Sequence, residues 1–94
     1  MKQYIATFFS HFGAIRFQRL CTKLGYEAQL APVPRSLSSS CGTCVLFSAP
    51  ELDANTLQQL LTPELEQLVL NVSNAASYTL LYSAEEALHL ETLH

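Results

Sequence analysis

The chain is poor in the residues that mark several familiar classes of protein. Its 94 residues include no tryptophan, three glycines, four prolines and three cysteines, and only 14% of them are charged. Three glycines argue against a glycine-rich phosphate-binding loop. No stretch approaches the roughly 18 consecutive apolar residues of a membrane span, and the amino terminus lacks a signal-peptide pattern. We therefore expect a single domain over residues 1–94, located in the cytoplasm, with no membrane partner.

Charge is distributed unevenly along the chain. All five basic residues precede residue 36, whereas seven of the eight acidic residues follow it. The basic residues are mixed with apolar helix positions and are accompanied by no aromatic-basic motif and no zinc finger, so we expect no nucleic-acid partner.

The amino-terminal half predicts two strands separated by a helix. Residues 4–9 are apolar on both faces, which is typical of a central strand. Residues 11–24 carry apolar side chains at helical spacing, with Ser10 as the amino-terminal cap. Residues 26–31 alternate apolar and polar side chains, and Pro32 has no amide hydrogen to continue a ladder, which predicts an edge strand. An exposed edge and low charge are compatible with a homodimer.

The second half predicts a doubly apolar strand at residues 44–47 and a last strand at 78–82. Between them, a Ser-x-x-Glu pattern that begins at Ser48 has the form of a capping box and predicts a helix. Thr62 followed by proline predicts a second helical start, so that two short helices, or one kinked helix, would end near Asn71.

These elements predict an α+β, ferredoxin-like β-α-β-β-α-β sandwich with a four-stranded antiparallel sheet. A pattern beginning at Ser83 adds a short carboxy-terminal helix. A rival interpretation makes residues 68–72 a strand paired with residues 78–82. In either arrangement the first two strands run toward the same end of the sheet, so the start of helix 11–24 and the loop 32–42 should lie together.

That loop contains most of the residues capable of chemistry. The run PVPRSLSSSCGTCVLF leads from Pro32 through a serine tract to Cys41 and into an apolar strand. A free thiol beside a guanidinium and hydroxyl groups could carry out sulfur chemistry. Arg35 would favour a thiolate, and the serines could donate hydrogen bonds to an anion. Cysteines in the cytoplasm are expected to be reduced.

The Cys-x-x-Cys spacing of residues 41–44 leaves other sites open. A closed zinc site needs four ligands, and the other candidates form no second pair, so we expect no metal. Those candidates are Cys21, His11, His89 and His94. If residues 41–44 are extended, their end Cα atoms lie roughly 10 Å apart, beyond the usual disulfide limit of about 7 Å. Gly42 could bend the segment, so a small thiol-disulfide protein remains an alternative.

The interpretation that we favour is one reactive thiol, Cys41, with Cys44 and Cys21 packed in the core. In the competing interpretation, Cys41 is only a small residue that the turn requires. A non-catalytic ferredoxin-like adaptor or anion-binding regulatory module also remains open, in which Arg35 rather than Cys41 would support binding.

The segments PVPR and LSSSCG, followed by an apolar strand, and the opening YIATFFSHFGAIRFQRL resemble the putative selenium/sulfur carrier protein-like family of small bacterial proteins. The resemblance covers residues 3–47. It implies a carrier rather than a turnover enzyme, with a persulfide-like adduct on Cys41, donor and acceptor proteins as partners, and no cofactor. The residues expected around the thiol are Arg35, Ser38, Ser39, Ser40, Gly42, Ser10 and His11.

Overall fold

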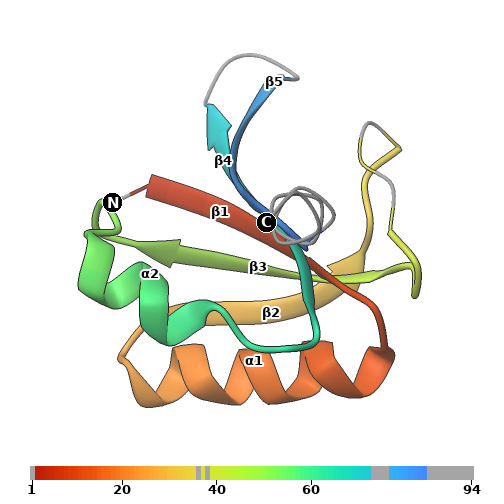
Figure 1. Cartoon of the computed structure of the whole chain (residues 1–94), viewed down its shortest axis with the longest axis horizontal. Coiled ribbons are helices and arrows are strands. Elements are labelled where there is room, and N and C mark those ends of the chain that lie inside the picture. Colours follow the sequence, from red (N-terminus) through yellow and green to blue (C-terminus); the bar gives the residue numbers. More distant parts are fainter. Residues whose placement is uncertain (1, 36, 38, 73–76, 85–94) are drawn as a thin grey trace, which may run out of the picture.

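In the computed structural model, which describes residues 2–35, 37, 39–72 and 77–84, the chain forms an α+β domain (Figure 1). Its described part contains five strands in one sheet and two helices. The bounds are β1 Lys2–Phe8, α1 His11–Lys23, β2 Glu27–Pro32, β3 Thr43–Ala49, α2 Ala54–Leu60, β4 Leu65–Val72 and β5 Ser77–Ser83. Neither of these helices is long and apolar enough to cross a membrane.

The strands lie in the order β2-β3-β1-β4-β5, and every neighbouring pair is antiparallel. β1 is the middle strand and is buried from Tyr4 to Phe8, as its apolar character on both faces predicts. β3 is also internal, and β2 lies at an edge. The positions predicted for these three strands are therefore confirmed.

The prediction of a four-stranded sheet with helix up to Asn71 is wrong. Residues 65–72 form β4, which pairs with β1 on one side and β5 on the other. Leu68 packs in the core under the helices, whereas its neighbour Val69 is buried on the opposite face. This two-residue alternation belongs to a strand, and pairing on both sides outweighs the local helix-start signal at Thr62. The rival interpretation of residues 68–72 is confirmed.

The helix start predicted at Ser48 is also wrong. Ser48 lies within β3, opposite Gln3 of β1 and Glu27 of β2. α2 begins six residues later, where the Asp53 side chain accepts a hydrogen bond from the Thr56 amide at 2.8 Å. An aspartate is as good a cap as a serine. Pairing of β3 with β1 and β2 continues through Ser48 and outweighs the local capping pattern there. The strand predicted at 78–82 is confirmed, and the helix predicted after Ser83 lies mostly outside the described residues.

Both helices cover one face of the sheet (Figure 1), which we call the helix face. Its core is aromatic: the ring centroid of Phe17 in α1 lies 5.1 Å from that of Phe8 and 5.5 Å from that of Phe47. Leu60 of α2 completes this core and is fully buried. The opposite face, which we call the open face, carries a smaller cluster of Ile5, Cys44 and Val69.

Candidate thiol site

The candidate site lies at the end of the sheet where β1 and β2 finish and β3 begins. Residues 33–42 form the loop between β2 and β3, which the Val33 amide closes by donating to the Gly42 carbonyl at 3.1 Å. Gly42 has a φ of +77°, a left-handed conformation that favours glycine over residues with a side chain. The closed turn places Cys41 two residues before β3.

Cys41 is half-buried and packs against the helix-face core. Its Sγ donates to the Thr43 carbonyl at 3.3 Å, and the Ser39 Oγ lies 4.0 Å from the same sulfur. Ser39 in turn donates to the Phe8 carbonyl at the end of β1. Because only a protonated thiol can donate, Cys41 must lose this proton before it can act as a nucleophile.

The start of α1 reaches the same end of the sheet, as the chain direction predicts. The His11 Nδ1 lies within hydrogen-bond distance, 3.1 Å, of the Thr43 Oγ1, and both groups are accessible to solvent. Thr43 therefore contacts His11 through its side chain and Cys41 through its carbonyl. Thr43 was not among the predicted site residues, because no local pattern distinguishes it from other threonines at the start of a strand.

Ser40 turns toward β4. Its amide donates to the Glu66 Oε1 at 3.0 Å, and its hydroxyl donates to the Glu66 Oε2 at 2.8 Å. Thr7 pairs with Gln67 and Phe8 with Leu65, so Glu66 is the extra residue of a β-bulge. Bulges re-aim side chains next to sites, and here the carboxylate fixes the residue that precedes Cys41.

Glu66 was missed by the sequence analysis because β4 itself was predicted as helix. An acidic residue inside the apolar run LEQLVLNV is the only signal that could have drawn attention to it.

Ser10 caps α1, as predicted, by accepting from the Gly13 amide at 3.0 Å. Its hydroxyl also donates to Glu64, whose other carboxylate oxygen pairs with Arg16 at 3.0 Å. A Cβ on Gly13 would lie 2.6 Å from the Glu64 Cβ, so this close approach requires glycine. No hydrogen bond of the described residues joins Ser10 to Cys41.

The predicted site also included Arg35 and Ser38. Arg35 is exposed and forms no hydrogen bond or ion pair with any described residue. Ser38 lies outside the described residues. The structure thus gathers Cys41, Ser39 and, through Thr43, His11. It directs Ser40 to Glu66, and the role of Arg35 stays a prediction.

All three cysteines are free thiols, and two of them are buried, as predicted for core residues. Burial raises the pKa of Cys21 to about 12. Burial, followed by the charge of the nearby Cys41, also raises the pKa of Cys44. Cys44 belongs to the open-face cluster, whereas Cys41 packs against the helix-face core. Among the described residues, no group of three potential ligands could hold a metal ion.

These features define a small α+β domain with a solvent-accessible thiol on a closed loop. Residues 3–65 match the family model described as Putative Se/S carrier protein-like, that is, selenium/sulfur carrier. Because this match spans more than half of the chain, the protein belongs to that family. The matched region includes Cys41, Ser10 and His11 and stops at the first residue of β4, one position before Glu66. No curated protein and no solved structure matches the chain.

Proposed function

We propose that the protein carries a terminal sulfur or selenium atom on Cys41. The observation that supports this most directly is exposure: of the three cysteines, all described, Cys41 is the one that solvent reaches. Family membership and the surrounding polar groups support the same assignment. The donor and the acceptor would be proteins whose thiols exchange the atom with Cys41.

In the proposed cycle, Cys41 first loses its proton and then attacks the outer sulfur of a persulfide on the donor. A new S–S bond forms at Cys41, the S–S bond of the donor breaks, and its electron pair leaves on the donor thiolate. Transfer to an acceptor thiolate repeats the exchange and regenerates the Cys41 thiolate. Selenium would follow the same path, with a terminal selenium in place of the outer sulfur.

The neighbours of Cys41 suit these steps. The Cys41 thiol donates to the Thr43 carbonyl, and His11 contacts the side chain of that residue. In the proposed cycle, His11 would act as the nearby base that takes up the proton as Cys41 ionises. The Ser39 hydroxyl, 4.0 Å from the sulfur, would donate to an anionic adduct. Arg35 is exposed in the same loop, and its positive charge would stabilise that anion over a longer distance.

We further propose a ferredoxin-like arrangement of the fold and a cytoplasmic location. The order β2-β3-β1-β4 with antiparallel pairing supports a ferredoxin-like arrangement, to which β5 is an addition. A carrier with a free loop thiol would work in the cytoplasm, where thiols are kept reduced.

Intact-protein mass spectrometry tests the function directly. The protein is incubated with glutathione persulfide and separated from the reagent, and its mass is measured before and after reduction. We expect one added sulfur atom per chain, removable by a thiol reductant and absent from Cys41→Ser. His11→Gln and Ser39→Ala should slow loading without abolishing it.

Cys44→Ala provides the matched control, because it removes the neighbouring cysteine on the other face and should retain full loading. Loading that persists in Cys41→Ser, or that disappears only in Cys44→Ala, would show that Cys41 is not the carrier residue.

A further inference from the structure

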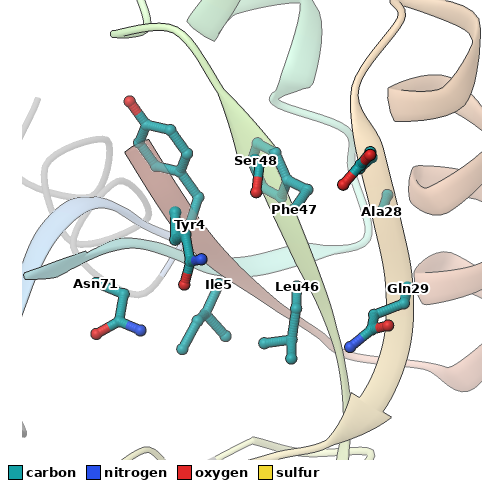
Figure 2. A pocket seen from close by; sticks show the side chains of 10 residues that line it. Tyr4, Ile5, Ala28, Gln29, Leu46, Phe47, Ser48 and Asn71 are labelled. Carbon is teal, nitrogen blue, oxygen red and sulfur yellow. The ribbon is translucent and has the colours of Figure 1, made fainter. Parts of the chain in front are cut away.

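A pocket lies on the open face of the sheet, away from the loop that carries Cys41 (Figure 2). Its volume is about 330 Å³, at the lower end of the range for ligand sites. Four strands contribute to it, β2, β3, β1 and β4, and neither described helix covers this face. The lining residues are Gln3, Tyr4, Ile5, Glu27, Ala28, Gln29, Leu46, Phe47, Ser48 and Asn71.

Strand register arranges the lining side chains in two rows across the sheet. The outer row is polar and follows the pairs that link Glu27, Ser48, Gln3 and Asn71. The inner row follows the pairs that link Gln29, Leu46 and Ile5. Figure 2 shows Gln29, Leu46, Ile5 and Asn71 pointing to the same side of the sheet, while Tyr4 points to the other.

The chemistry of the two rows is complementary to a peptide. Ile5, 4% exposed, and the partly exposed Leu46 form an apolar floor that suits an aliphatic side chain. The carboxamides of Gln3, Gln29 and Asn71 can each donate and accept, as peptide groups require. Glu27 is the one charged residue of the lining and is not balanced there by a cation. A basic residue in the ligand would balance the negative charge of Glu27.

We propose that this pocket binds a short peptide segment that presents an aliphatic side chain next to a basic residue, both facing the sheet. The aliphatic side chain lies on Ile5 and Leu46, and the basic side chain faces Glu27. The pocket sits at the Gln3 end of β1, whereas Cys41 lies beyond the Phe8 end and on the helix face. Peptide binding is therefore independent of the proposed carrier function, and either can fail alone.

The test is an NMR titration of the ¹⁵N-labelled protein with three dipeptides, acetylated and amidated at their ends: Leu-Lys, Leu-Gln and Leu-Glu. We expect saturable shifts of the Gln3, Gln29 and Asn71 side-chain amides. Affinity should fall in that order, by about threefold per step, the size expected of one solvent-exposed charge pair. Absence of saturable shifts with all three dipeptides overturns the proposal, as do shifts confined to other parts of the protein.

Two substitutions assign the contacts. Glu27→Gln should bring the Leu-Lys and Leu-Gln affinities together, because Glu27 is exposed and its loss leaves the fold intact. Leu46→Ala should weaken all three dipeptides, whereas Leu81→Ala, at an exposed leucine outside the pocket, should change none. Circular dichroism checks that each variant is folded. An unchanged order of affinities in Glu27→Gln would overturn the assigned peptide chemistry.

Discussion

The two faces of the sheet are built by different means. The helix face is closed by two helices over stacked and tilted aromatic rings, and Phe8, Phe17 and Leu60 are all fully buried. The open face has a cluster of three buried residues, over which Val33 and Leu37 of the loop pack, and a pocket beyond it. Apolar area buried on the helix face is therefore the larger source of stability among the described residues.

Cys41 and Cys44 show the same contrast at the scale of two residues. They are three positions apart, yet Cys41 packs beside the helix-face core at the solvent boundary and Cys44 is completely buried on the open face. Cys41 lies in the loop before β3, on the other side of the left-handed Gly42, whereas Cys44 lies within the strand and faces the open side. In the structure the two cysteines of the Cys-x-x-Cys spacing are free thiols that pack against different clusters.

Thiol alkylation should show the largest difference. Burial raises the pKa of Cys21 from 9.0 to about 12, so at mildly alkaline pH its thiolate is about a thousandfold scarcer than that of an ordinary cysteine. We expect iodoacetamide to modify Cys41 in the native protein and to reach Cys21 and Cys44 only after unfolding in urea. Peptide mapping by mass spectrometry measures all three. Native labelling of Cys44 as fast as Cys41 would contradict the separation between the faces.

Core truncations should compare the two faces in stability. Phe17→Ala removes a ring that contacts Phe8 and Phe47, and we expect a loss of about 3 to 5 kcal/mol in the free energy of unfolding. Leu46→Ala on the open face should cost about 1 to 2 kcal/mol, because Leu46 is only partly buried. Urea denaturation followed by circular dichroism measures both. Equal losses in the free energy of unfolding would mean that the two faces contribute equally to stability.

The Glu66 contact should have a smaller and more local effect. Glu66→Ala removes both acceptors of Ser40, and we expect a loss of about 1 to 2 kcal/mol together with faster exchange of the Ser40 amide hydrogen. Glu51→Ala is the control, because its ion pair with Lys2 is exposed and contributes little. If Ser40 exchanges equally fast in the native protein and in Glu66→Ala, the bulge does not hold the loop.

The cap of α2 should give the smallest effect, visible only as a pH dependence. Hydrogen bonds from the Thr56 amide and hydroxyl lower the pKa of Asp53 below its ordinary 3.8. The charged cap therefore adds stability that is fully present above that value and is lost as pH falls through the lowered pKa. Asp53→Asn keeps an acceptor but does not titrate. The difference in Tm between the two proteins should shrink below about pH 3.8; a constant difference would contradict this account.

The amino-terminal half could be predicted from the sequence because its signals are local. Apolar residues at helical spacing mark α1, and an apolar run on both faces marks β1 as internal. The spacing of Leu65 and Leu68 fits a helix, and the bulge at Glu66 is what lets both side chains reach the same core from a strand, which the local pattern could not show. Pairing with β1 and β5, distant in the sequence, decided for the strand.

For the candidate site, sequence alone predicted which cysteine solvent would reach and where it would lie: after a serine tract, at the same end of the sheet as the start of α1. Tertiary structure alone decided that Glu66 holds Ser40, that Thr43 connects His11 to Cys41, and that the open face carries a pocket. The physical reason is range. Capping, turn and strand signals act over a few residues, whereas a bulge or a strand register exists only after distant segments pair.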